Sequence, residues 1–188
     1  MKNINVDVDL NWFENDELFF NELHKGRQYE LYIGLLLMNE GFAVKCSPKR
    51  DSVKRKTIHD RHKFKDQKDL LVGSFNKKPI LFEVKSRNLN FTSPIDYPFE
   101  TAIVSTVNSW KIRKEKPHII LLVSQKTKKI IGINRTSFDK WSINENQRDN
   151  VRNITDPSYL CHRDYFISWD KIINWLHNIY KVEEVKEN

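Results

Sequence analysis

The order of the predicted elements indicates an α/β fold with a central mixed β-sheet flanked by helices. A helical pattern comes first, several apolar β-type segments follow, and a second amphipathic helix closes the chain. This order is typical of one sheet covered by helices. The 188 residues contain only 5 Gly and 6 Pro, and they show no repeat or low-complexity segment. A flexible linker is therefore not expected, and we predict a single domain over residues 1–188.

The first helix is predicted over residues 27–39. Its apolar side chains recur every three or four residues, as on one face of a helix, at Tyr29, Tyr32, Ile33, Leu36 and Leu37. Gly41 stands where a helix C-cap favours positive φ. A shorter helix over residues 16–24 is expected to precede it, with Gly26 at the junction.

The middle of the chain is predicted to be β-structure. Strands are expected over residues 42–44, 69–72, 80–85, 119–124 and 130–134. Turn residues separate the second and third of these, which favours an antiparallel hairpin. Residues 101–107 are rich in β-branched side chains and favour a strand, with a helix as the alternative.

The C-terminal part is predicted to combine a connection with a helix. Residues 142–163 are polar and rich in Asn and Arg, which indicates a long connection. Residues 169–180 carry an apolar stripe at helical spacing, and Ser168 precedes them as a potential N-cap.

Composition excludes several classes of protein. Lys and Arg number 32 against 25 Asp and Glu, so the net charge of +7 favours a polyanionic partner such as nucleic acid, anionic lipid or a ribosome. Two cysteines exclude a disulfide-rich scaffold, and no apolar run is long enough to span a membrane. A soluble, cytoplasmic protein is expected, in the host cytoplasm if a phage encodes it. Zinc-binding Cys-x-x-Cys, Gly-x-Ser-x-Gly and phosphate-binding Gly-rich motifs are absent from the sequence.

One predicted strand carries chemistry that a structural strand does not need. Glu83 and Lys85 share a face with Leu81, because side chains alternate along a strand. Burying these charges is costly unless they are paired or bind a metal, although a salt bridge on an exposed face is the simpler alternative. Asp69 begins the partner strand of the hairpin, so the fold can bring its carboxylate beside Glu83. A divalent cation relieves the repulsion between two such carboxylates.

These residues resemble the PD-(D/E)xK nuclease family. The resemblance consists of Asp69, a gap of thirteen residues, and then Glu83, Val84 and Lys85. Glu30, one position off the apolar stripe of the first helix, resembles the acidic residue of that family's first core helix, with a helix-surface glutamate as the alternative. The resemblance covers about residues 25–134 and leaves residues 135–188 as a C-terminal extension. Lys68 stands where the family often has proline, and Asp66 is a rival for the first acidic position.

The resemblance implies a restriction-endonuclease-like core and a Mg²⁺-dependent endonuclease, with Mn²⁺ as a substitute. It implies that Asp69, Glu83 and the carbonyl of Val84 hold the metal. Lys85 would orient the attacking water or stabilise the transition state, and Glu30 would hold a water or a second ion. Gln125 would contact phosphate or water, or else is a plain turn residue. Restriction, homing, resolvase and phage-type nucleases share this core, and such nucleases often act as homodimers. DNA is the expected substrate, with RNA left open.

The alternative is a non-catalytic DNA- or RNA-binding protein that retained the nuclease fold. The intact set of Asp69, Glu83 and Lys85 argues against it.

Two basic groups are candidates for nucleic-acid binding. Residues 45–68 contain ten Lys or Arg and three Asp, and they are predicted to form a loop that grips the phosphate backbone or is simply solvated. Its proposed contacts are Lys49, Arg50, Lys54, Arg55, Lys56, Arg61, Lys63 and Lys65. Lys111 and Arg113, beside Trp110, form either a DNA-facing surface or ordinary surface charge.

Overall fold

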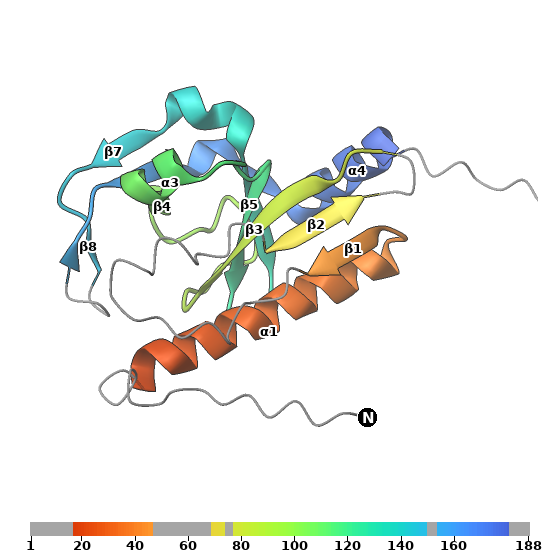
Figure 1. Ribbon diagram of the computed structural model, residues 1–188, viewed down its shortest axis with the longest axis horizontal. Coiled ribbons are helices and arrows are strands. Elements are labelled where there is room, and N and C mark those ends of the chain that lie inside the picture. Colours follow the sequence, from red (N-terminus) through yellow and green to blue (C-terminus); the bar gives the residue numbers. More distant parts are fainter. Residues whose placement is uncertain (1–16, 47–68, 74–76, 150–153, 181–188) are drawn as a thin grey trace, which may run out of the picture.

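The computed structural model describes residues 17–46, 69–73, 77–149 and 154–180. Its centre is a six-stranded mixed sheet with the strand order β1-β2-β3-β5-β6-β11 (Figure 1). These strands are β1 (Ala43–Cys46), β2 (Leu70–Gly73), β3 (Ile80–Arg87), β5 (Ile119–Ser124), β6 (Ile130–Asn134) and β11 (Phe166–Ser168). Neighbours pair antiparallel except β3 and β5, which are parallel. The predicted α/β fold with a central mixed sheet is confirmed.

Two helices cover one face of this sheet. They are α1 (Glu17–Asn39) and α4 (Trp169–Tyr180), and both contribute buried side chains to one core. From β3 this core receives Ile80 and Phe82, with Val84 packed against it. Because side chains alternate along a strand, Leu81, Glu83 and Lys85 project to the opposite face. The side chains of the candidate site residues Glu83 and Lys85 therefore lie on the face away from α1 and α4.

A second, smaller sheet belongs to the opposite face. It has the order β4-β10-β7, from β4 (Thr101–Thr106), β10 (Ser158–His162) and β7 (Ser142–Asn144). Its core joins buried residues of β4 and β10 to Ile120 and Leu122 of β5 and to Trp110 of α3 (Val107–Ile112). In Figure 1 this sheet and α3 lie on the side of the large sheet away from α1. Residues 101–107 thus form a strand that passes directly into a short helix.

The prediction of a long connection over residues 142–163 is wrong. This stretch contains β7 and β10 and the small pair β8 (Arg148–Asp149) and β9 (Ile154–Thr155). Two short 3₁₀ turns, η2 (Arg135–Lys140) and η3 (Arg163–Tyr165), lie before and after these strands. Among the side chains of this stretch whose burial is described, few are fully buried, such as Ser158 and Cys161, so the polar composition hides the strand pattern. Further on, β11 adds the sixth strand of the large sheet and α4 helps to close its core.

The prediction of two N-terminal helices separated at Gly26 is also wrong. α1 is continuous from Glu17 to Asn39. A glycine inside a helix costs only about 1 kcal/mol relative to alanine, which packing of the rest of the helix offsets. The predicted C-cap is confirmed: Gly41 has φ of 87°, and its amide donates to Met38 O at 3.0 Å while that of Phe42 donates to Leu37 O at 3.1 Å. These two bonds form a Schellman motif.

Three predicted elements agree closely with the structure. The hairpin of β2 and β3, the pair β5 and β6, and α4 occupy nearly the residues expected for them. The amide of Lys171 donates to Ser168 Oγ at 3.4 Å, so Ser168 caps α4. The proposed basic loop lies largely at residues 47–68, outside the described residues. In the part of the chain that is described, no helix is long and apolar enough to cross a membrane.

Candidate active site

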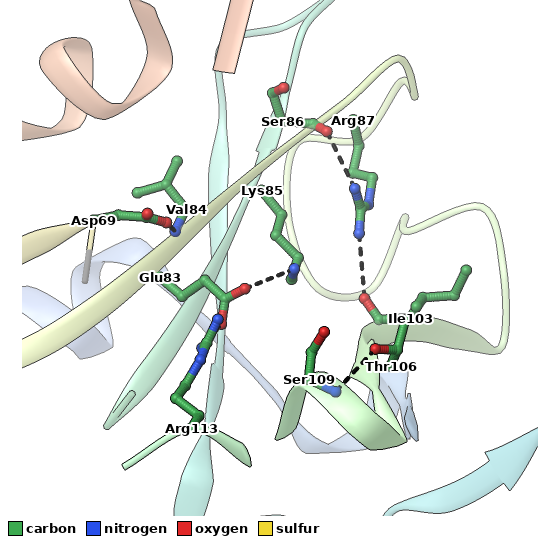
Figure 2. Close-up of polar contacts among 10 residues, drawn as sticks. All are labelled: Asp69, Glu83, Val84, Lys85, Ser86, Arg87, Ile103, Thr106, Ser109 and Arg113. Atoms are coloured by element: carbon green, nitrogen blue, oxygen red, sulfur yellow. Dashed lines mark hydrogen bonds and ion pairs between the residues drawn. The ribbon is translucent and has the colours of Figure 1, made fainter. Parts of the chain in front are cut away.

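The candidate site lies where β2 begins and β3 continues past it. β2 pairs with β3 in the register Leu70 to Phe82, so one further step places Asp69 opposite Glu83. β3 has no partner from β2 beyond this point, and its next amide would lack an acceptor. Asp69 Oδ2 supplies one, because it accepts a hydrogen bond from Val84 N at 2.7 Å (Figure 2). The carboxylate of Asp69 thus ends the hydrogen-bond ladder between β2 and β3 and is also part of the candidate site.

Glu83 lies between two cations. Its Oε1 lies 2.7 Å from Lys85 Nζ, and its Oε2 accepts a hydrogen bond from Arg113 Nη1 (Figure 2). All three side chains are at most about one-fifth exposed, with Glu83 12% exposed. Burial raises the pKa of Glu83, but Lys85 and Arg113 together lower it to about 2. Glu83 is therefore ionised throughout the physiological range.

Asp69 has the opposite electrostatics. Burial, the neighbouring Glu83 and, to a smaller extent, Glu30 raise its pKa, the Val84 amide and Lys85 lower it, and the net pKa is about 7. The proton of Asp69 is therefore influenced by three nearby charged side chains, those of Glu83, Glu30 and Lys85. Asp69 accepts its hydrogen bond from an amide and not from a cation, so a positive charge placed beside it would favour its ionised form.

Glu30 reaches this region from α1. It is only 4% exposed, which is unusual for a glutamate, and its Oε2 lies 2.8 Å from Arg27 Nη1 one turn earlier. The helix packs against β1, β2 and β3, on the face that carries Phe82. Glu30 therefore approaches Asp69 from the face opposite Lys85, and it is not an exposed helix-surface residue.

Gln125 lies farther along the sheet. Its backbone N–H donates to Arg87 O at 2.8 Å, and its side-chain Nε2 donates to Ser86 Oγ at 3.3 Å. These contacts place it beside the end of β3, and the described contacts do not include Asp69 or Glu83. Ser86 follows Lys85 directly, so Gln125 is linked to the site through one neighbouring residue.

The second basic group divides into different environments. Trp110 is 5% exposed and stacks on Phe138 with ring centroids 5.7 Å apart, so it is a core residue and not a platform for bases. Lys111 is exposed. Arg113 lies against Glu83, thirty positions away in the sequence. No local pattern in the sequence signals this contact, because it depends on the path of the chain between β3 and β5. The eight residues proposed from the first basic group, between Lys49 and Lys65, lie outside the described residues.

The donor atoms suit a hard divalent cation in part. Carboxylate and carbonyl oxygens from Asp69, Glu83 and Val84 are the ligand types that Mg²⁺ prefers. Asp69 fits well, because it is a partly buried carboxyl group with two other acidic groups nearby. Both oxygens of Glu83 already hold a cation, so a metal has to displace one of these partners. Among the described residues, no group of three or more His, Cys, Asp or Glu side chains has the geometry of a metal centre.

Comparisons with known proteins add little to this picture. No protein-family model matches the chain, and no curated protein sequence matches it. Among solved structures, the chain is similar to a nuclease from a fusselovirus, with 13% sequence identity, a TM-score of 0.44, and coverage of 84% of this chain and 94% of that chain. The function proposed for this chain is therefore supported by its own side chains.

Proposed function

We propose that the chain is a metal-dependent nuclease that hydrolyses phosphodiester bonds in DNA. The observation that supports this most directly is the pairing of Asp69 and Glu83 across neighbouring strands, with Lys85 beside Glu83 on the same face. The same three residues carry the resemblance to PD-(D/E)xK nucleases. An exposed salt bridge, the simpler alternative, does not account for a partly buried Asp69 whose pKa is about 7.

Asp69, Glu83 and the carbonyl of Val84 would hold Mg²⁺, or Mn²⁺ in its place. The bound cation would polarise the scissile phosphate and favour deprotonation of the attacking water. Glu30 would add negative charge to the site from the α1 side, because its carboxylate is near enough to raise the pKa of Asp69. Occupancy of the site by a cation would also remove the repulsion that raises the pKa of Asp69.

Lys85 has the position of a group that assists water. Its ammonium lies 2.7 Å from Glu83, which holds it in place, and its side chain is about one-fifth exposed to solvent. It can donate hydrogen bonds to a water molecule or to a phosphate oxygen as negative charge develops. Gln125, which bonds to the neighbouring Ser86, would help to orient the same part of β3.

A polyanionic substrate agrees with the charge of the chain. The net charge is +7, and Arg113 and Lys85 bring two cations to the site itself. The contacts proposed here, from Lys85 and Arg113, recognise the phosphate backbone, which carries no sequence information. DNA is the substrate proposed, and RNA is one arm of the test.

The test is a cleavage assay on supercoiled, linear, single-stranded and branched DNA and on RNA, each with Mg²⁺, with Mn²⁺ and with chelator. We expect metal-dependent cleavage that Asp69→Asn or Glu83→Gln abolishes. Lys85→Met should lower the rate by about 10²–10⁴-fold, the range typical of a positioned proton-transfer group. Thermal unfolding of each variant checks that the fold is retained.

Matched controls are available on exposed turns. Glu145→Gln and Lys129→Met remove an acid and a base that are exposed, and both variants should cut at the wild-type rate. Wild-type activity in Asp69→Asn or Glu83→Gln would contradict the site. Binding of DNA without any cleavage under these conditions would favour the non-catalytic alternative.

A further inference from the structure

Arg113 is fixed by a rigid local framework. It is the C-cap of α3, a helix of only six residues that begins with a hydrogen bond from Ser109 N to Thr106 Oγ1 at 3.2 Å. Trp110 anchors this helix, stacked on Phe138 and edge-to-face with Trp141. These contacts fix the backbone position from which the side chain of Arg113 reaches Glu83.

The backbone that follows Arg113 is also tied down. The carbonyl of Arg113 accepts a hydrogen bond from Lys116 Nζ, and the carbonyl of Lys116 accepts one from Arg135 Nη1 at 3.0 Å. β5 begins three residues after Lys116 and pairs with β3, the strand of Glu83. Arg113 is thus held from both sides, by α3 before it and by β5 after it.

The guanidinium of Arg113 still has unused donors. Its described hydrogen bond is from Nη1 to Glu83, and an arginine carries five N–H groups. Among the described residues, no buried side-chain nitrogen or oxygen lacks a hydrogen-bond partner, so the other guanidinium nitrogens reach solvent. The planar donor pattern of a guanidinium matches two oxygens of a phosphate.

A divalent cation and Arg113 compete for the same carboxylate. Arg113 and Lys85 already neutralise Glu83, whereas Asp69 has no described cation partner. A metal held by both acids needs an oxygen of Glu83. The contacts described above hold the backbone of Arg113, and its long side chain is free to turn away from Glu83. Lys85 lies two positions from Glu83 on the same strand, so we expect Arg113 to be the partner that releases the carboxylate.

We propose that Arg113 is a further catalytic residue of this site, which neutralises Glu83 until a divalent cation takes that carboxylate and then binds the phosphate of the substrate. This inference rests on the proposed nuclease function. It adds a second role for Glu83, which binds the guanidinium of Arg113 until the metal arrives. It assigns to Arg113 a contact with the reacting phosphate, whereas the sequence indicated either a DNA-facing surface or ordinary surface charge.

The first experiment measures metal binding without nucleic acid. Titration of the full chain with Mn²⁺ in a calorimeter should show that Arg113→Met binds about tenfold more tightly than wild type, because a positive charge beside Glu83 repels the incoming cation. Arg113→Lys keeps the charge and should bind Mn²⁺ as wild type does. Arg163→Met is the matched control, since it removes an exposed arginine on η3 and should leave the affinity unchanged.

The second experiment measures cleavage under saturating Mn²⁺. Arg113→Met should cut about 10²–10³-fold more slowly than wild type, the loss typical for one donor to a developing oxyanion. Arg113→Lys should recover part of that loss, because an ammonium supplies the charge but not the bidentate geometry. A tighter-binding and slower-cutting variant is the combined result that supports the inference.

The outcomes separate this inference from the function on which it rests. If the wild-type chain binds no Mn²⁺ and cuts no nucleic acid, both fail. If the wild type binds and cuts but Arg113→Met equals it in Mn²⁺ affinity or in rate, only the inference is overturned. Weaker Mn²⁺ binding by Arg113→Met, in a variant that unfolds at the wild-type temperature, would show that the arginine supports the metal and would also overturn it.

Discussion

At the scale of single residues, two adjacent carboxyl groups have widely different pKa values. Glu83 has a pKa of about 2 and Asp69 a pKa of about 7, although they face each other across two strands. Both are removed from water, so the difference comes from their partners. Lys85 and Arg113 compensate Glu83, whereas Asp69 receives an amide hydrogen bond and lies near two other acids. Pairs of carboxyl groups with separated pKa values are typical of catalytic sites.

This contrast predicts how stability depends on pH without metal. The pKa of Asp69 is about 7 in the folded protein against an ordinary value of 3.8, so the folded state holds the proton more tightly. Its contribution to stability is therefore full below pH 4 and is lost as the pH rises through 7. Asp69→Asn, which mimics the neutral acid, should be more stable than wild type by about 1–3 kcal/mol at pH 8, since water screens part of the full effect.

Urea unfolding at several pH values, in the presence of chelator, measures this difference. The advantage of Asp69→Asn should shrink toward pH 4, where the wild-type carboxyl is protonated. Ionised Glu83 also contributes stability, which is lost as the pH falls below its usual pKa of 4.5. This loss is the same in both proteins, so it cancels in the difference between their free energies of unfolding. A constant difference from pH 4 to pH 8 would contradict the raised pKa.

The sequence predicted the residues of the hairpin because their spacing is local. Alternation along a strand places Glu83 and Lys85 on one face, and a hairpin brings Asp69 to its partner. For Arg113 the sequence indicated a DNA-facing surface or ordinary surface charge. It did not indicate the contact with Glu83, which spans thirty positions and depends on a parallel strand pairing. A contact between residues so far apart in the chain leaves no periodic pattern in the sequence, so only the three-dimensional structure shows it.

At the scale of elements, α3 depends on its anchor. A helix of six residues is not stable alone, since isolated helices of fewer than about 12 residues are marginal in water. Trp110 provides the tertiary contact, through rings of Phe138, Trp141 and Tyr159 with centroids between 5.1 and 6.3 Å away. The aromatic cluster therefore holds the helix that delivers Arg113.

Trp110→Leu should accordingly destabilise the protein by about 2–4 kcal/mol, because a leucine leaves part of the aromatic space empty. Ile112→Ala is the matched control within the same helix, since Ile112 is 45% exposed, and it should change the free energy of unfolding by less than about 0.5 kcal/mol. Thermal or urea unfolding distinguishes the two. Equal effects would mean that α3 is not anchored through Trp110.

Elements with a strong period were predicted and those without one were not. α4 shows its stripe because Ile172, Ile173 and Leu176 are all buried on one side. The strands of residues 142–163 are short and mostly polar, and they are held by pairing with β4 and with each other. Gly26 indicated a break that the continuous α1 does not have, because packing elsewhere along the helix outweighs the preference of one residue.

At the scale of the whole molecule, the C-terminal helix is joined to the strands that carry the acids. Tyr180 at the end of α4 is 3% exposed, and its hydroxyl lies 2.8 Å from Val72 O and 3.1 Å from Lys78 O. These carbonyls belong to β2 and to the segment that leads into β3. The last helix therefore stabilises the hairpin of Asp69 and Glu83 from the opposite face of the sheet.

Tyr180→Phe removes the hydroxyl and leaves the two carbonyls without this partner, so it should cost about 1–3 kcal/mol. Tyr165→Phe is the control, because Tyr165 is 41% exposed and its loss should be close to neutral. Urea denaturation of the two variants provides the measurement. An unchanged midpoint for Tyr180→Phe would show that the link between α4 and β2 carries no stability.

The single parallel pair in the large sheet also has a kinetic consequence. The antiparallel hairpins join residues close in sequence, such as Leu71 with Leu81 and Val123 with Ile130, whereas the parallel pair joins Phe82 to Ile119. Closing the longer segment costs more chain entropy, so this pairing should form late during folding. The two acids would then come together while the chain is still collapsing, and the guanidinium that neutralises one of them would arrive after the hairpin has formed.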